Sequence, residues 1–327
     1  MIPSPPKLHD EQSSRLRWNT AFVGLVYGMQ MESARGKSVS DVGAQVMTFR
    51  LSITTHFLTI DVADWTSDPA VAEIVARRNF DPLDGRAGDT VNALLDRLAA
   101  TSSWATFFLS GPIARRDAPL IRRIVRSGHE VAARGAPGFL EPDQFRNDAR
   151  LVKSSIEDAV GVQVRGFRSR VAAKGPSMWR FEVLIEEGYE YDSSRLPRLA
   201  RGPLDQAVPT YPQTIVCAAG TLIEVPLLTQ PFAKQAFSLR RTPYAAVQQV
   251  FASRTRAGMP GVASFATWEI DHEQPKINLP VLTSWRHYRG RRAAHDRVDR
   301  LLNEFRFDAI GHRLSELAEQ APTTYAM

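Results

Sequence analysis

The sequence is nearly free of cysteine, with Cys217 the only one among 327 residues. A single thiol excludes an intrachain disulfide framework and is typical of a reducing compartment, so we predict a cytoplasmic location. Cys217 stands in an apolar, strand-like run, TIVCAAG. We therefore interpret it as a small packing residue and not as a nucleophile.

Long hydrophobic runs and clustered lysines are missing as well. No stretch has the roughly 20 apolar residues of a membrane span, and the apolar segment 21–31 is followed by Glu32 instead of a small-residue cleavage site. We predict neither a membrane span nor a secretory signal. The net charge is +6, but the arginines are scattered. This pattern predicts no nucleic-acid partner and favours an acidic glycan or a phosphorylated ligand.

The most informative stretch that is present is HFLTIDVADW, residues 56–65. A run of β-forming residues ends in two acids, Asp61 and Asp64. This pattern predicts a buried parallel strand that delivers carboxylates to a site, because ligand and catalytic groups collect at the carboxyl ends of parallel strands. The alternative is a buried strand followed by two solvated loop acids.

Strands and helices alternate along the rest of the chain in units of roughly 30 residues, which predicts an α/β fold with a parallel sheet or barrel. We expect one domain over residues 51–320 and a loosely ordered N-terminal extension over residues 1–50. The expected strands are 56–65, 104–111, 129–133, 164–169, 222–227 and 261–270, and the segment YEYDSS stands at 189–194. The expected helices are 91–102 with Asp89 as N-cap, 112–127, 141–160, 176–187, 243–257 and 285–305.

The order of these segments resembles the polysaccharide deacetylase family with the NodB-homology fold, in particular its branch linked to bacterial exopolysaccharide synthesis. The resemblance spans residues 56–306 and implies a distorted (β/α) barrel of about seven strands. It rests on TIDVADW (59–65), WATFFLSGPIARRDAPLIRRIVRSGHEVA (104–132), GFRS (166–169), EEGYEYDSS (186–194), WEIDHEQPKI (268–277) and RHYRGRRAAHDRVDRLLNEFRF (286–307).

The resemblance implies a divalent metal, usually zinc, held by a carboxylate of the first motif and by two histidines after the GHE strand. The metal polarises an amide carbonyl and activates water, while an aspartate acts as base. Asp61 matches that base, and Asp64 matches the last acid of the first motif. The two histidine positions, however, hold Arg134 and Gly138.

Other positions also depart from the family pattern. Ala63 stands where the branch has glutamate, and Ala266 and Thr267 replace a histidine and a proline just before Trp268. In the third motif Arg168 is kept, but the proline two residues later is Arg170.

These departures argue against a metal. A guanidinium cannot ligate zinc, and at roughly 4 Å and an effective dielectric of about 20 its repulsion of a dication costs about 8 kcal/mol. We predict no metal cofactor and loss of metal-dependent deacetylation. Asp271 and His272 are the least implausible substitute ligands, although a structural role is the ordinary expectation for each histidine.

The predicted site keeps acidic, basic and aromatic side chains, and two functional hypotheses remain. In the first, Arg134 replaces the metal as a fixed cation and the groove binds a carbohydrate or an anionic small molecule, with Trp268 as a stacking platform. In the second the protein is an enzyme, either a deacetylase with altered ligands or a metal-free acid/base catalyst. The candidate residues are Asp61 and Asp64 for catalysis, and Arg134, Arg168, Arg170, Asp192 and Trp268 for ligand binding.

Structural alternatives stand beside each role. The arginines would form plain ion pairs in place of a lost metal site, and Trp268 would pack in the core. Asp192 would accept hydrogen bonds at a strand end. A third class of function, an interaction scaffold, would use the basic helix 285–305.

Overall fold

The computed structural model describes residues 55–78, 86–136, 138, 141–169, 178–197, 208–229 and 237–325. The expected N-terminal extension and Arg170 lie outside these ranges, so both remain predictions. Among the described residues, no helix is both long enough and apolar enough to cross a bilayer.

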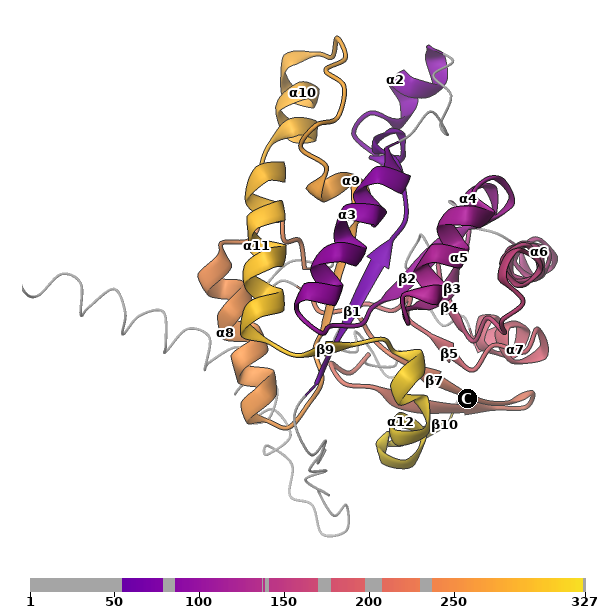
Figure 1. Cartoon of the computed structure of the whole chain (residues 1–327). Helices are drawn as coiled ribbons and strands as arrows, with labels where there is room; N and C mark the ends of the chain where they lie inside the picture. The colour runs from indigo at the N-terminus through magenta and orange to yellow at the C-terminus, as the bar shows by residue number, and fades with distance from the viewer. Residues whose placement is uncertain are drawn as a thin grey trace, which may run out of the picture. The chain divides into compact units, whose positions relative to one another are not determined.

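The described strands form one sheet of ten, in the order β10-β6-β7-β5-β4-β3-β2-β1-β8, with β9 paired to β1 (Figure 1). Neighbouring strands run parallel except β6 and β7, which form an antiparallel hairpin. The predicted α/β fold is confirmed. Within the described ranges the hydrogen-bonded path ends at β8 and β10 and does not close. The strands are β1 (His56–Asp61), β2 (Thr106–Ser110), β3 (Glu130–Arg134), β4 (Gly166–Arg168), β5 (Tyr191–Asp192), β6 (Gln213–Cys217), β7 (Gly220–Glu224), β8 (Val262–Ala266), β9 (Phe307–Asp308) and β10 (Thr323–Tyr325).

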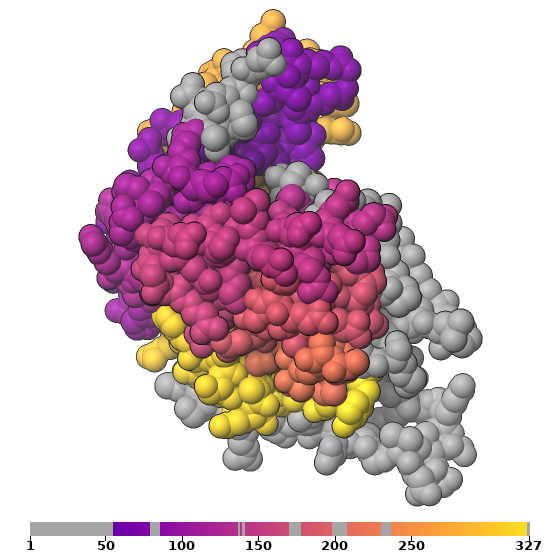
Figure 2. Space-filling model, turned by 90° about the vertical axis from the view of Figure 1, so that its right-hand side faces the viewer, coloured from indigo at the N-terminus to yellow at the C-terminus, as the bar shows by residue number. Residues whose placement is uncertain are grey.

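Helices fill most of the connections between parallel strands. Helices α4, α5 and α6 pack beside one another against β2 and β3, α7 packs against α6, β6 and β7, and Figure 2 shows the face that these helices build. Helices α3 and α11 contact α9, which follows β8 directly. The helices are α2 (Ala72–Arg77), α3 (Ala87–Ala100), α4 (Gly111–Arg116), α5 (Ala118–Arg126), α6 (Pro142–Val160), α7 (Met178–Glu186), α8 (Tyr244–Arg256), α9 (Thr267–Ile270), α10 (Val281–Tyr288), α11 (Arg291–Glu304) and α12 (Leu314–Gln320), with short 3₁₀ turns η1 (Trp65–Ser67) and η2 (Gly311–Arg313).

Side chains alternate between the two faces of the sheet, as the period of two of a strand requires. On one face, Leu58 and Ile60 belong to the large cluster packed against the helices. On the other face, Phe57 and Phe108 belong to a second cluster that α12 helps to close. We call this second face the inner face. Cys217, expected as a packing residue, is half-buried at the end of β6.

Several expected elements differ in their limits. The segment 112–127 is two helices, because the Asp117 side chain caps Leu120 and starts α5. The segment 285–305 is divided by Gly290, which has a φ of 81° that favours glycine. The strand expected over 261–270 ends at Ala266, where α9 begins.

The start of α3 also differs from the prediction. The helix begins at Ala87, so Asp89 lies inside its first turn and is not the N-cap. The carboxylate of Asp64 accepts the Ala87 N–H at 2.9 Å and serves the helix end instead. Strands β9 and β10 and helices α2 and α12 were not anticipated from the sequence pattern, whereas β6 covers the strand-like run that ends at Cys217.

Candidate functional site

Asp61 ends β1, and its carboxylate contacts Arg134 at the end of β3 and Arg168 at the end of β4. Its Oδ2 lies 2.9 Å from Nη2 of Arg134, and its Oδ1 accepts a hydrogen bond of 3.1 Å from Nη1 of Arg168. Strand β1 pairs with β2, β2 with β3 and β3 with β4, and Arg134 is in register with Arg168. All three residues end parallel strands and share the inner face. The structure therefore brings together Asp61, Arg134 and Arg168, as the sequence predicts.

Every N–H group of the Arg168 guanidinium donates a hydrogen bond within the protein. Its Nη1 also donates to Ser264 Oγ, its Nη2 donates to Thr59 Oγ1 and Ser193 Oγ, and its Nε donates to the Ser193 carbonyl, at 3.0 to 3.1 Å. The guanidinium, only 3% exposed, also lies 4.0 Å from the centre of the Phe108 ring. Burial lowers its pKa, and the charge of Asp61 opposes that shift. In this arrangement Arg168 holds Asp61 in place, and its predicted contact with a ligand remains a prediction.

Arg134 differs from Arg168 because it keeps an unused donor. Its side chain is 13% exposed, and among the described residues its Nε has no hydrogen-bond partner. Two guanidiniums and one carboxylate give the trio a formal charge of +1. The trio is thus polar, partly accessible and not neutral.

This donor set does not fit a zinc ion. A metal site needs about three ligating side chains on one wall, and the described residues contain no group of three histidine, cysteine, aspartate or glutamate side chains placed to hold one. The neighbours of Asp61 are guanidiniums instead. The suggested substitutes do not lie beside it either, since Asp271 pairs with Arg86 at 3.0 Å and the His272 ring packs against His295.

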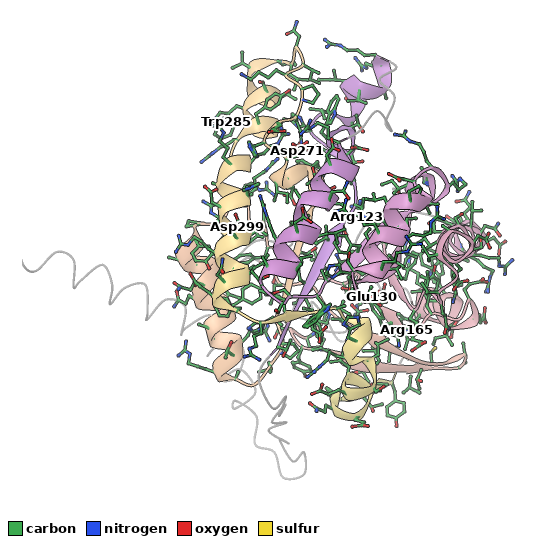
Figure 3. The ribbon with its side chains drawn as sticks, viewed as in Figure 1. Arg123, Glu130, Arg165, Asp271, Trp285 and Asp299 are labelled. Carbon is green, nitrogen blue, oxygen red and sulfur yellow. The ribbon has the colours of Figure 1, made fainter. Side chains whose placement is uncertain are left out.

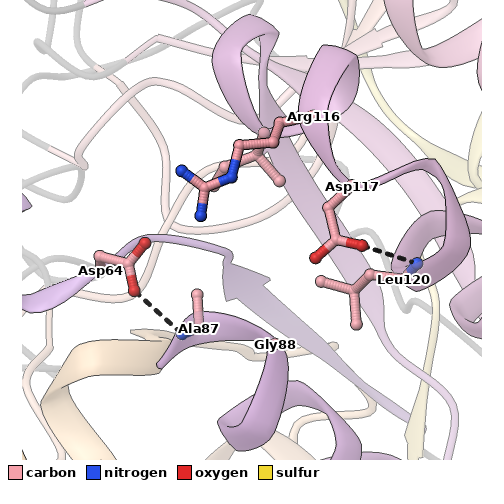
Figure 4. Close-up of a pocket in the computed structure, with 7 residues that line it drawn as sticks. Asp64, Ala87, Gly88, Arg116, Asp117 and Leu120 are labelled. Carbon is pink, nitrogen blue, oxygen red and sulfur yellow. Dashed lines mark hydrogen bonds between the residues drawn. The ribbon is translucent and has the colours of Figure 1, made fainter. Parts of the chain in front are cut away.

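Asp64 lies in different surroundings from Asp61. It is 8% exposed and lines a small hollow of about 30 Å³ with Gly88, Arg116 and Asp117 (Figure 4). Burial raises its pKa, while the Ala87 N–H and the charge of Arg116 oppose the shift. The structure shows no contact between the two aspartates, so Asp64 is placed to cap α3.

Asp192 points away from Asp61. Its neighbour Tyr191 belongs to the inner cluster, so Asp192 faces the helices and its charge acts on Arg180 of α7. There Asp192 accepts a hydrogen bond from Ser194 and is in register with Glu224. Burial raises the pKa of both carboxyl groups. The predicted hydrogen bonding at a strand end matches this geometry.

Trp268 packs beside the edge of the sheet. It is half-buried on α9, with the His287 ring stacked at 6.3 Å and the Arg240 guanidinium 4.9 Å from its ring centre. Buried Arg291, which the sequence pattern placed on an exposed basic helix, lies 6.0 Å from the same ring. The apolar neighbours of Trp268 are Trp65, Val71, Val75, Ile277 and Leu279. A sugar-stacking role for Trp268 remains a prediction.

Sequence reasoning missed the residues that complete the network. Thr59, Ser193 and Ser264 accept from Arg168, and Glu224 pairs with Asp192. The signal for Thr59 is its place two residues before Asp61, because that spacing puts both side chains on one face. The other partners come from strands whose register cannot be counted along the sequence.

Two protein-family models match the chain. The model described as polysaccharide deacetylase matches residues 73–183, and a domain of unknown function (DUF3473) matches residues 196–315. No curated protein sequence matches the chain.

Solved structures share the fold at low sequence identity. A protein from Mycobacterium smegmatis assigned as a polysaccharide deacetylase is 18% identical with a TM-score of 0.58, covering 88% of this chain and 97% of that one. One from Pseudomonas aeruginosa PAO1 with the same assignment is 16% identical with a TM-score of 0.54, covering 80% and 90%. Puue allantoinase is 13% identical with a TM-score of 0.56, covering 87% and 100%. The segments that carry the resemblance, the matching family model and the shared fold agree: residues 73–183 form a domain that matches the polysaccharide deacetylase family, and the chain shares the fold of these structures.

Proposed function

We propose that this protein binds a carbohydrate or an anionic group at the Asp61 end of the sheet and has lost zinc-dependent de-N-acetylation. The supporting observation is the way Asp61 is held, with one carboxylate oxygen against Arg134 and the other against Arg168. A carboxylate placed in this way has cations where a metal would have to stand. The matches to the polysaccharide deacetylase model and to DUF3473 favour a bacterial polysaccharide or glycoconjugate pathway.

The charge balance supports an acidic ligand over a neutral one. Asp61 neutralises one of the two guanidiniums, and the unpartnered Nε belongs to Arg134, the more exposed of the two. The Nε atom itself is buried, but the Arg134 side chain is partly exposed, and a carboxylate or sulfate group on a sugar can accept a charge-assisted hydrogen bond from the guanidinium. Arg134 is therefore the ligand contact, and Arg168 acts only by fixing Asp61.

Calorimetric titration with a uronic-acid oligosaccharide and with a neutral oligosaccharide of the same length tests the proposal. We expect binding of the acidic sugar, weakened about tenfold or more by Arg134→Met because a charge-assisted contact contributes roughly 1.5–3 kcal/mol. Arg150→Met on α6, an exposed arginine paired with Glu187, is the matched control and is expected to bind as the parent does. Equal affinity of parent and Arg134→Met for the acidic sugar would refute the assignment.

The metal part of the proposal has a separate test. Protein purified with zinc in every buffer is measured by elemental analysis after gel filtration. A stoichiometric metal content that Asp61→Asn abolishes would overturn the loss of the metal site. We expect the metal content to be far below one ion per chain and unchanged by that substitution.

The alternative is a metal-free catalyst in which Asp61 acts as base and Arg134 stabilises a developing oxyanion. It is favoured by the same unpartnered donor, which lies beside a carboxylate. Release of acetate from N-acetylated oligosaccharides separates the two hypotheses. Turnover that disappears in Asp61→Asn while sugar binding persists would establish the enzyme.

A further inference from the structure

Three large apolar side chains on α10 are exposed to solvent. Val281 is 88% exposed, Leu282 59% and Trp285 54%. Their spacing places them on one side of the helix, since residues three and four apart are neighbours on a helical surface. Figure 3 shows Trp285 on the side of α10 that faces away from β1.

The opposite side of α10 is firmly attached to the protein. His287 is fully buried and lies 2.7 Å from Asp68, and Arg240 donates hydrogen bonds to the carbonyls of Arg286 and His287. The Tyr288 hydroxyl accepts the Ile277 N–H at 2.9 Å. The helix thus has a fixed orientation that directs its apolar side outward.

The segment that carries the apolar side is basic. Residues 275–292 contain five lysines and arginines and no aspartate or glutamate. All but Arg291 are exposed, namely Lys276, Arg286, Arg289 and Arg292. The Arg289 guanidinium lies 4.4 Å from the centre of the Trp285 ring, so a cation sits at the level of the exposed indole.

We propose that α10 docks this protein onto an anionic lipid bilayer. Tryptophan and aliphatic side chains on one helix side, with basic side chains around them, match a surface whose negative headgroups overlie an apolar interior. A protein partner fits less well, because a stable protein interface buries about 800 Å² on each partner and three side chains on an eight-residue helix offer much less.

The docking surface lies at the same end of the sheet as Asp61. Helix α10 follows α9, which begins where β8 ends, and Ala266 of β8 is in register with Asp61. Figure 1 shows α10 beyond the carboxyl end of β1. Docking through α10 therefore turns that end of the molecule toward the lipid. The proposal does not depend on which ligand the Asp61 site binds.

Flotation of the full chain with vesicles tests the proposal, using phosphatidylcholine alone and phosphatidylcholine with about 30% phosphatidylglycerol. We expect flotation with the anionic vesicles only, decreasing as salt is added. The variant Val281→Ser/Leu282→Ser/Trp285→Ser is expected to lose about tenfold or more in bound fraction. The matched control, Trp104→Ser/Leu151→Ser/Val162→Ser, removes exposed apolar side chains elsewhere and is expected to bind as the parent does.

A separate pair of variants tests the exposed basic side chains on and beside α10. Arg286→Glu/Arg289→Glu is expected to abolish binding to anionic vesicles, whereas Arg122→Glu/Arg126→Glu on α5 retains most of it. An unchanged melting temperature shows that each variant is folded. Failure of the parent to bind anionic vesicles, or equal binding by the α10 variants and their controls, overturns the proposal. So does a change from dimer to monomer in the α10 triple variant, which would identify a second copy of the chain as the partner.

Discussion

Each end of β3 carries an ionisable side chain, and the two side chains differ in how completely they are hydrogen-bonded. At the amino end, half-buried Glu130 accepts hydrogen bonds from the Thr106 hydroxyl, the Tyr191 hydroxyl and the Gly311 N–H, at 2.6, 3.1 and 2.7 Å. At the carboxyl end, Arg134 faces Asp61, and no residue in the described part of the chain accepts a hydrogen bond from its Nε. A charged group with complete hydrogen bonding fixes a loop, whereas an incompletely partnered one can receive a ligand.

The pKa of Glu130 reflects the first case. Burial raises it, and the donors from Thr106, Gly311 and Tyr191 oppose the shift. Arg165 lies nearby but donates to the Gly311 carbonyl at 2.6 Å, so it strengthens the same loop contact (Figure 3). The amino end therefore ties η2 to the sheet, and the comparison assigns structure to one end of β3 and binding to the other.

The largest loss of stability is expected from a change at Arg168, the arginine that holds Asp61 in place. Arg168→Met removes a buried guanidinium and leaves Asp61, Thr59 and Ser193 without its donors. We expect the free energy of unfolding to fall by about 3–5 kcal/mol in urea denaturation. Arg150→Met, at an exposed ion pair, should cost at most about 1 kcal/mol. A loss of similar size in both variants would contradict the role given to Arg168.

The sequence predicted which strand ends meet, but not how their charges are divided. Asp61, Arg134 and Arg168 each end an apolar run, so their meeting at one edge follows from parallel strands. The saturation of Arg168 depends on Thr59, which is 109 residues away, and on Ser264, which is 96 residues away. Only the register of the folded sheet shows that these hydroxyls converge on one guanidinium.

Local competition explains the errors in the predicted elements. The pattern SFATWEI after Val262 resembles a continuing strand, yet Thr267 bonds across to the backbone of Ala63 and the chain turns into α9 there. Asp89 resembles an N-cap, but Asp64, 23 residues before Ala87 in the chain, supplies the carboxylate to the start of α3. In both cases a partner distant in the sequence overrides a plausible neighbour.

The second prediction concerns the amino end of β3, where the Gly311 N–H donates to Glu130. A methyl group added at Gly311 would lie 2.3 Å from Glu130 Oε1 and 2.9 Å from Arg165 Nη2. Gly311→Ala is therefore expected to cost about 1–3 kcal/mol of unfolding free energy and to leave sugar binding at Asp61 unchanged. Gly88→Ala inside α3, where the nearest atom is 3.7 Å away, should be neutral or slightly stabilising. If Gly311→Ala also weakens sugar binding, the two ends are not independent.

The third effect is a pH dependence on the helix-facing side of the sheet. Burial raises the pKa of Glu224, and the charge of Asp192 raises it further. A raised carboxyl pKa contributes stability that is complete below the ordinary carboxyl pKa and is lost as pH rises through the folded-state value. Glu224→Gln keeps a donor toward Asp192 without titrating. We expect thermal melts from about pH 5 to about pH 9 to show the parent losing stability relative to this variant. Parallel curves would show that the pair holds no shared proton.

The smallest stability effect should belong to the residue with the largest effect on binding. In Arg134→Met, Asp61 keeps Arg168, and the lost pair is partly exposed, at 13% and 16%, so we expect a cost of about 0.5–1 kcal/mol. Double-mutant cycles with Asp61→Asn should give a larger coupling for Arg168 than for Arg134. The reverse order would mean that Arg134 is the structural partner. Because a cation retained for the fold should be costly to remove and one retained for a ligand should be cheap, this order separates the two guanidiniums on one carboxylate.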